Sequence, residues 1–237
     1  MKIGITGAEG FIGSHLAAAC VRRGWQVIAG GREIFTADGC MAEFVRQCDR
    51  IVHFAGGSRH PDGEYLYRTN MELASMLDRA LQTDPRPLYF ASTTHDVLRD
   101  LPYHRSKRDG RALLESSGRY PVVTLRMANV FGPGSKPFYN SVVSTFCRIA
   151  ADGGTPEKVD DVMLELIYID ELTEILCSHL AESAPESGAV TVAARHFLPL
   201  PDLWQKLAAW RVNPPPEPAG LDAMLYRTLE SYRNSCK

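Results

Sequence analysis

Tyr103 and Lys107 place a phenol and an ammonium group four residues apart in one short stretch of the chain. Side chains at this spacing lie on the same face of a helix. A nearby ammonium group favours the phenolate and so lowers the pKa of a tyrosine from about 10. Such a phenol can donate a proton to a carbonyl oxygen, or take one from an alcohol, near neutral pH. The alternative is an exposed helical pair without a chemical role, since this spacing is common by chance.

A segment rich in hydroxyl groups precedes this pair. Ser92, Thr93 and Thr94 follow a predicted strand at residues 87–91. A hydroxyl group at a strand end can hydrogen-bond the same carbonyl oxygen that the tyrosine protonates. We therefore predict a catalytic site made of one of these hydroxyls, the phenol and the ammonium group.

A glycine-rich turn joins a predicted strand at residues 2–6 to a predicted helix at residues 14–21. In such a turn, which suits a dinucleotide pyrophosphate, Gly7 permits the tight bend, Gly10 lets the backbone approach the phosphates, and Gly13 lets the helix pack closely. The free N–H groups and positive dipole end of the helix favour the anion. The alternative is a structural turn without a ligand.

The end of the second predicted strand bears on the choice of cofactor. An acidic residue there holds the ribose 2′-OH of NAD, whereas an arginine accommodates the 2′-phosphate of NADP. The chain has Gly31 followed by Arg32, so there is room for the phosphate and a guanidinium to pair with it. Glu33 is one residue late, and we expect it to point away. Glu9 adds negative charge near the phosphates and is the opposing signal, so we predict NADP(H), with NAD(H) as the alternative.

Strands and helices alternate through the first half of the chain. Predicted strands cover residues 2–6, 25–29, 49–55, 87–91 and 120–126. The longer predicted helices cover residues 14–21, 64–81 and 103–117. Between residues 33 and 48 there is room only for a reduced edge strand at 35–38 and a short helix at 41–48. Strands separated by helices predict an α/β fold, a Rossmann-type doubly wound parallel sheet.

The alternation loosens after residue 130. We predict a helix at 138–150, a strand at 164–169, a helix at 171–180 capped by Asp170, a strand at 188–193, a linker at 214–218 and a helix at 221–232. We assign residues 1–130 to an NAD(P)-binding core, to which residues 164–193 return. Residues 131–163 and 194–237 form a small substrate-binding lobe at the C-terminal side.

The composition is that of a soluble globular protein. The 237 residues are 45% apolar and 23% charged, with a net charge of −2, and the apolar runs are short. We therefore predict neither a membrane nor a nucleic-acid partner. The N-terminus enters a strand directly, so we expect no signal peptide. The six cysteines have no metal-binding spacing, which predicts reduced thiols, a cytoplasmic protein and no metal site.

Several motifs in order resemble one family. Residues 6–13 resemble a TGxxGxIG loop, residues 52–56 an HxAG segment, residues 126–134 an RxxNVFGPG segment, and residues 168–172 a (H/Y)VDD(L/I) segment. With the Tyr-x-x-x-Lys pair, they are similar to the extended short-chain dehydrogenase/reductases that act on nucleotide sugars. The resemblance covers about the first 180 residues. Helices at 64–81 and 103–117 form a dimer bundle in similar proteins, which implies a homodimer; an intramolecular core is the alternative.

The resemblance assigns roles to individual residues. It implies that Thr93, Tyr103 and Lys107 are catalytic. The residues expected at the cofactor are Gly7, Glu9, Gly10, Phe11, Ile12, Gly31, Arg32, Phe54, Ala55, Gly56, Asn70, Tyr103 and Lys107. The residues expected at a nucleotide-sugar substrate are Ser58, Arg59, Thr94, Asn129, Lys136, Tyr139 and Asn140.

A closer resemblance lies at residues 136–147, which are similar to the KPxYNSVxxTFC stretch of one subgroup. That subgroup comprises reductase domains of bifunctional capsular-polysaccharide enzymes of the UDP-N-acetyl-L-fucosamine pathway. It implies NADPH-dependent reduction of a 4-keto-6-deoxy sugar nucleotide, with epimerisation in a fused cupin domain. Since the sequence ends at Lys237, we expect a stand-alone reductase or a separate epimerase.

Two other functions share these motifs. An epimerase that retains NAD⁺ uses the same three catalytic groups, whereas a dehydratase usually has an Asp-Glu pair where Thr94 and His95 stand. A non-catalytic NADP-sensing regulator is the other alternative, although such proteins typically lack the tyrosine or the lysine.

Overall fold

The computed structural model describes residues 1–36, 39–96 and 99–233. The chain divides into two compact units. The first contains Met1–Met127 and Thr173–Val192, and the second contains Ala128–Leu172 and Ala193–Lys237. This division differs from our predicted boundaries at residues 128–130, 164–172 and 193, all of which belong to the second unit.

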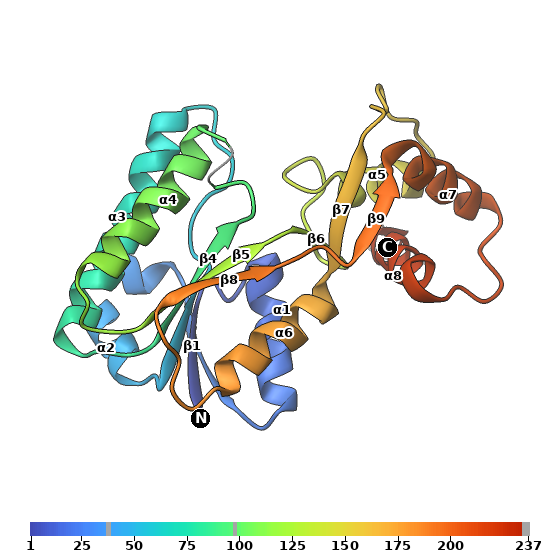
Figure 1. Ribbon diagram of the computed structural model, residues 1–237. Coiled ribbons are helices and arrows are strands. Elements are labelled where there is room, and N and C mark those ends of the chain that lie inside the picture. Colours follow the sequence, from blue (N-terminus) through green and yellow to red (C-terminus); the bar gives the residue numbers. More distant parts are fainter. Residues whose placement is uncertain (37–38, 97–98, 234–237) are drawn as a thin grey trace. The chain divides into compact units, whose positions relative to one another are not determined.

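A parallel sheet forms the centre of the first unit (Figure 1). Its six strands are β1 (Lys2–Thr6), β2 (Gln26–Gly30), β3 (Arg50–His53), β4 (Leu88–Thr93), β5 (Val122–Met127) and β8 (Gly188–Val192). They lie in the order β2-β1-β3-β4-β5-β8, and every pair is parallel. Because the strands are parallel, the C-terminal ends of β1 to β4 reach the same edge of the sheet.

Helices cover both faces of this sheet, as Figure 1 shows. The helices of the first unit are α1 (Phe11–Arg22), α2 (Cys40–Arg46), α3 (Gly63–Thr83), α4 (Pro102–Ser116) and the part of α6 (Ile169–Ala181) from Thr173 onward. α2, α3 and α4 lie on one face, and α1 and α6 lie on the other. The predicted doubly wound α/β fold is therefore confirmed.

The apolar faces of α2, α3 and α4 bury a continuous core against the sheet. Burying one large aliphatic side chain stabilises the fold by about 1.5–3 kcal/mol. The members of this core are Ile34, Met41, Phe44, Val45, Cys48, Ile51, Ala74, Leu77, Ala80, Leu81, Leu88, Phe90, Leu114, Tyr120 and Val122. Leu77 and Leu81 are one helical turn apart on α3, as the predicted apolar spacing requires.

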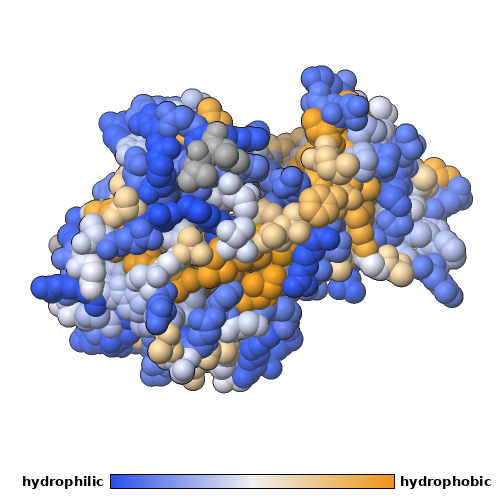
Figure 2. Space-filling view, viewed as in Figure 1, coloured by the Kyte–Doolittle hydropathy of each residue, from blue (hydrophilic) through white to orange (hydrophobic). Residues whose placement is uncertain are grey.

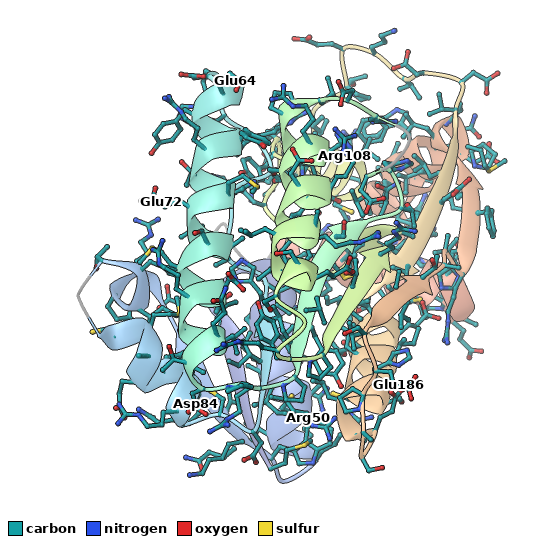
Figure 3. The ribbon with its side chains drawn as sticks, turned by 60° about the vertical axis from the view of Figure 1, so that its left-hand side comes forward. Arg50, Glu64, Glu72, Asp84, Arg108 and Glu186 are labelled. Atoms are coloured by element: carbon teal, nitrogen blue, oxygen red, sulfur yellow. The ribbon has the colours of Figure 1, made fainter. Side chains whose placement is uncertain are left out.

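Helices α3 and α4 lie side by side, with Glu64 at the start of α3 and Arg108 on α4 (Figure 3). The Asp62 carboxylate caps α3 by accepting hydrogen bonds from the N–H groups of Glu64 and Tyr65. The Tyr67 hydroxyl donates to Asp109 of α4 at 2.8 Å, and the Arg105 guanidinium lies over the Tyr67 ring. These contacts fix the helix that carries Tyr103 and Lys107.

The connection between β2 and β3 differs from our prediction. A 3₁₀ helix, η1 (Arg32–Phe35), follows β2, and Thr36 lies in a turn. The edge strand predicted at 35–38 is therefore wrong at residues 35 and 36, and residues 37 and 38 lie outside the described residues. The predicted short helix is confirmed as α2, which ends at Arg46 rather than at 48.

The described residues of the second unit form a three-stranded sheet, three complete helices and the first turn of α6. Its strands are β6 (Asn129–Phe131), β7 (Met163–Tyr168) and β9 (His196–Pro199), with β6 and β7 parallel and β7 and β9 antiparallel. Its helices α5 (Val142–Ala151), α7 (Leu200–Val212) and α8 (Gly220–Arg233) pack on one another. Figure 2 shows hydrophobic residues gathered over β7 and β9. Met163 of β7 and Phe197 of β9 are exposed.

Several predictions for the second unit were wrong. The helix expected at 138–150 begins at Val142, because Phe138 has a φ of 57° and the Ser141 hydroxyl caps the helix by accepting from the Ser144 N–H. Asp170 is not a cap but lies inside the first turn of α6, where the Glu171 carboxylate accepts from the Tyr168 N–H. β6, β9 and α7 were not predicted.

The turn between β1 and α1 is too tightly packed for side chains at two of its glycines. Gly7 has a φ of 70°, and a Cβ built there would lie 2.9 Å from the Ala55 nitrogen. A Cβ built on Gly13 would lie 2.2 Å from the Gly7 carbonyl oxygen. Backbone atoms surround both positions, so the clash has no flexible side chain to relieve it.

We predict that Gly13→Ala lowers the free energy of unfolding by about 1–3 kcal/mol, because the added methyl group forces α1 away from the loop. Urea denaturation measures the change. Gly188→Ala is the matched control, since a Cβ there meets nothing within 4 Å, and we expect a change of less than about 0.5 kcal/mol. Equal effects of the two substitutions would contradict the packing argument.

Candidate active site

Thr93 is the last residue of β4 and begins a tight turn. Its hydroxyl oxygen accepts a hydrogen bond from the His95 N–H at 3.3 Å, and its carbonyl oxygen accepts from the Asp96 N–H at 3.2 Å. The Thr94 N–H donates to the Met127 carbonyl oxygen at the end of β5. The turn therefore holds the half-buried Thr93 side chain at the C-terminal edge of the sheet.

Lys107 and Tyr103 lie together on α4, as the sequence predicts. The Lys107 ammonium nitrogen is 5.8 Å from the centre of the Tyr103 ring and 5.1 Å from the centre of the Phe90 ring on β4. Lys107 is only 7% exposed, and burial lowers the pKa of its amine to about 8. The cation is thus held in an apolar setting beside the phenol.

Thr6 and His53 form a buried polar pair beneath this site. The Thr6 hydroxyl oxygen is 2.8 Å from His53 Nδ1 and also accepts from the Ala55 N–H at 3.1 Å. Burial, with a further effect from the Lys107 charge, lowers the pKa of His53 to about 3. The His53 ring stacks on Phe90 at 5.9 Å, so a neutral imidazole packs against the aromatic ring that also contacts Lys107.

Sequence reasoning did not select Thr6, His53 or Phe90 as site residues. The signal available was a polar side chain inside a strand that is otherwise buried, since a buried polar group needs a partner. Phe90 gave no signal, because an aromatic residue in a central strand is expected in any core.

Asn70 links α3 to the loop after β3 and to α4. Its side-chain oxygen accepts from the Gly57 N–H at 2.8 Å, and its side-chain nitrogen donates to the Gly57 carbonyl and to the Ser106 hydroxyl, both at 2.9 Å. Gly56 has a φ of 138°, and a Cβ there would lie 2.9 Å from the Asn70 oxygen. All three hydrogen bonds of this buried amide are made to protein atoms, so Asn70 fixes the loop and α4 in place.

Asp96 is a buried carboxylate behind the Thr93 turn, and it was also not selected. It accepts from the Ser92 hydroxyl at 2.9 Å and lies 3.4 Å from Arg126 Nε on β5. Its other oxygen has no hydrogen-bond partner among the described residues. The Arg126 cation and the Ser92 hydroxyl therefore anchor the turn to the sheet from below.

The glycine turn and the two neighbouring strand ends fit a dinucleotide. The N-terminus of α1 is lined by the backbone of three glycines, Gly7, Gly10 and Gly13. Among the described residues no side chain caps this helix, so its N–H groups are available to a phosphate. Phe54, Ala55 and Gly56 follow β3 beside this turn, since the Thr6 carbonyl accepts from the Phe54 N–H. Glu9 is exposed, Phe11 packs against His15, and Ile12 is half-buried.

Glu33 does not point away from the end of β2, contrary to our expectation. Its Oε1 accepts a hydrogen bond from the Gly31 N–H at 2.9 Å. The 3₁₀ helix that begins at Arg32 turns the chain back and brings residue 33 over residue 31. Arg32 is exposed beside it.

The predicted substrate residues fall in both units. Ser58, Arg59 and Thr94 belong to the first unit, with Ser58 and Arg59 in the loop before α3. In the second unit, Asn129 begins β6 and is exposed, and the Lys136 ammonium lies over the Tyr139 ring at 5.2 Å. Asn140 is exposed next to them.

Two kinds of feature are missing from the part of the chain that the structure describes. No group of three His, Cys, Asp or Glu side chains there could hold a metal ion. No helix there is both long and apolar enough to span a bilayer.

Comparison with known proteins identifies the family to which this chain belongs. Residues 3–193 match the model of the "NAD dependent epimerase/dehydratase family". The chain belongs to this family. The family predicted from the motifs is thereby confirmed, and the doubly wound unit is the nicotinamide-dependent fold of the epimerase/dehydratase enzymes.

Individual relatives refine the comparison. The chain is 30% identical over 244 residues to the UDP-2-acetamido-2,6-beta-L-arabino-hexul-4-ose reductase of Pseudomonas aeruginosa, covering 98% of this chain and 65% of that protein. It is 28% identical to the capsular polysaccharide assembling protein CapF of Staphylococcus aureus, with a TM-score of 0.78, covering 100% of this chain and 67% of CapF. The chain therefore spans about two thirds of the length of these relatives.

An epimerase has a closely similar fold. The UDP-glucose 4-epimerase of Thermotoga maritima, solved with UDP-glucose, is 18% identical and has a TM-score of 0.86, with both chains fully covered. At this identity the likeness concerns the fold alone.

We predict that Asn70→Ala lowers the free energy of unfolding by about 2–4 kcal/mol, because it leaves the Gly57 backbone groups and the Ser106 hydroxyl without their partner. Urea denaturation of the protein measures this change. Gln47→Ala, which truncates an exposed amide of the same unit, is the control with little expected effect. A loss below about 0.5 kcal/mol for Asn70→Ala would refute the bridging role.

We predict that Lys107→Met stabilises the protein by up to about 3 kcal/mol at pH 7, although it removes a candidate catalytic group. The folded-state pKa of about 8 lies below the ordinary value of 10.5 for a lysine in water. At pH 7 the amine is therefore protonated in both the folded and the unfolded state, and the full cost of burying the charge is present. Between pH 8 and 10.5 the folded state loses its proton first, so this cost fades.

Urea denaturation of wild type and Lys107→Met at pH 7 and pH 10, without added cofactor, measures the effect. The advantage of the variant should shrink at pH 10, and Lys2→Met, at an exposed lysine, should show no such trend. Destabilisation by Lys107→Met at pH 7 would show that burial of this charge is not unfavourable.

Proposed function

We propose that the chain is an NADPH-dependent reductase of a 4-keto group on a nucleotide-linked 6-deoxyhexulose. The observation that supports it most directly is the buried Lys107 ammonium beside the Tyr103 ring, on the helix that follows the Thr93 turn. A phenol paired with a buried cation at a dinucleotide fold is suited to donating a proton to a carbonyl oxygen.

The proposed mechanism assigns one role to each side chain. The bound nicotinamide cofactor supplies the hydride that reaches the carbonyl carbon. Tyr103 donates its phenolic proton to the oxygen, and Thr93 donates a hydrogen bond that orients the same oxygen. Lys107 stabilises the phenolate that remains and binds the nicotinamide ribose. Asp96 and Asn70 hold the turn and the helix in register, because their hydrogen bonds lie within the protein.

The proposed substrate class is supported by the Pseudomonas relative, whose name describes a reductase of a UDP-linked hexul-4-ose. The carry-over is a proposal, since the chain spans 65% of that protein. We propose Ser58, Arg59, Thr94, Asn129, Lys136, Tyr139 and Asn140 as the substrate-binding residues.

The proposed preference for NADPH rests on Gly31 and Arg32. Glycine leaves space beside the adenosine ribose, and the exposed Arg32 guanidinium can pair with a 2′-phosphate. The remaining proposed cofactor contacts are those of the glycine turn, Phe54–Gly56 and the two catalytic side chains of α4.

An NAD-retaining epimerase is the second candidate, since the matched family is named for epimerases and dehydratases. The two functions differ in stoichiometry. A reductase consumes one NADPH for each ketone reduced, whereas an epimerase regenerates its bound cofactor.

We further propose a cytoplasmic homodimer that pairs through α3 and α4. Tyr65 of α3 is 50% exposed and could contribute to such an interface. The five described cysteines are free thiols, as in a reducing compartment.

We predict that Tyr103→Phe lowers kcat by about 10²–10⁴-fold, because the proton donor is lost while the ring remains. The assay follows NADPH oxidation with 4-keto-6-deoxy sugars linked to UDP, dTDP or GDP. The dissociation constant for NADPH should stay within about twofold, since the substitution removes one oxygen atom only.

Tyr65→Phe is the matched control, because this exposed phenol lies on α3 outside the site. Normal turnover by Tyr103→Phe would refute the assignment of the proton donor. Turnover of substrate without NADPH consumption, in protein purified with tightly bound NAD, would favour the epimerase instead.

A further inference from the structure

A positive and a negative side chain, Arg32 and Glu33, lie next to each other just after the end of β2. β2 ends at Gly30, and Gly31, Arg32 and Glu33 follow it into η1. The Glu33 carboxylate is fixed by the hydrogen bond that it accepts from the Gly31 N–H. The Arg32 guanidinium is exposed, and among the described residues no carboxylate lies within ion-pair distance of it.

The carboxylate occupies the space that a side chain at residue 31 would fill. A Cβ built on Gly31 would lie 2.4 Å from Glu33 Oε2 and 2.9 Å from Oε1. In dinucleotide-binding folds, an acid at this place accepts from the ribose 2′-OH. In this chain residue 31 is a glycine and has no carboxylate of its own. The carboxylate of Glu33, two residues later, lies at that position instead.

This carboxylate has a direct electrostatic consequence for the cofactor. A 2′-phosphate bound by Arg32 carries nearly two negative charges close to Glu33, and the Gly31 N–H that could bind it is already donated. A ribose 2′-OH, in contrast, is a neutral hydrogen-bond donor that the carboxylate can accept. Arg32 and Glu33 thus favour different cofactors.

We infer that Glu33 is a specificity-determining residue that opposes Arg32 and limits the preference for NADPH over NADH. The inference rests on the proposed function, in which Arg32 pairs with the 2′-phosphate. Glu33 weakens NADPH binding by repulsion and strengthens NADH binding by accepting from the ribose hydroxyl. The wild-type protein therefore binds both cofactors, with a modest preference for NADPH.

Glu33→Gln tests this inference, because glutamine keeps the length of the side chain and its acceptor oxygen but removes the charge. The dissociation constants for NADPH and NADH are measured by the fluorescence of the reduced nicotinamide, without any sugar substrate. We expect the ratio of the NADH constant to the NADPH constant to rise about tenfold, which is about 1.4 kcal/mol. Raised salt should reduce this difference, since exposed charges are screened.

Glu43→Gln is the matched control. Glu43 is an exposed carboxylate on the neighbouring helix α2 that pairs with Arg46 and Gln47, and its loss should leave the ratio within twofold. Glu33→Asp is the second variant, because its shorter carboxylate cannot reach the Gly31 N–H in the same way; the ratio should rise by a smaller factor. A ratio within twofold of wild type in both Glu33 variants overturns the inference.

Arg32→Ala separates this inference from the proposed cofactor preference. A fall of about tenfold in the ratio supports the pairing of Arg32 with the phosphate. If Arg32→Ala leaves the ratio unchanged while Glu33→Gln raises it, the proposed role of Arg32 fails and the effect of Glu33 stands. Absence of ketone reduction would refute the proposed activity and leave both binding results intact.

Discussion

The hydroxyl group of Thr6 is the contact on which the candidate site depends. It lies between His53 and the Ala55 N–H, and so joins the end of β1 to the end of β3. The glycine turn starts immediately after Thr6, and the loop that Asn70 holds starts immediately after Ala55. One side chain therefore sets the spacing of two loops that the dinucleotide fold requires to be adjacent.

His53, the partner of Thr6, affects the charge at the site through its burial. The His53 ring is buried between Thr6 and Phe90. Because burial disfavours the charged form, the pKa of His53 lies far below neutral and the ring stays uncharged. A protonated imidazole there would repel Lys107, whose own pKa is already lowered by burial. The neutral histidine thus lets Lys107 remain a cation at neutral pH, where it can act on the phenol.

The sequence predicted the elements that strong local signals define. The glycine turn, the buried strands and the apolar spacing of α3 reflect backbone and packing needs that are local in the chain, and the structure confirms them. The pairing of Tyr103 with Lys107 followed from helical spacing alone, and the structure places the two together. Their catalytic role remains a prediction.

Other features depend on contacts that the sequence does not display. Phe35 was assigned to a short edge strand because a full strand and helix do not fit between residues 33 and 48. In the structure η1 ends at Phe35, and this 3₁₀ helix places Glu33 against Gly31. β6 and β9 are three and four residues long, too short for a periodic signal, and they form only because both pair with β7. Tertiary pairing decided these segments.

The position of β8 in the chain has a consequence for folding. β8 pairs with β5 in the first unit, although the two strands are far apart in the sequence. Between them the chain forms β6, α5 and β7 of the second unit and then returns to the first unit in α6. During synthesis the five strands from β1 to β5 leave the ribosome first, and the edge of β5 stays unpaired until β8 emerges. An unpaired edge of a parallel sheet is a template for pairing with another chain. A nascent chain that stalls before residue 188 therefore exposes the unpaired edge of β5. We expect the nascent chain to need chaperones most during this interval.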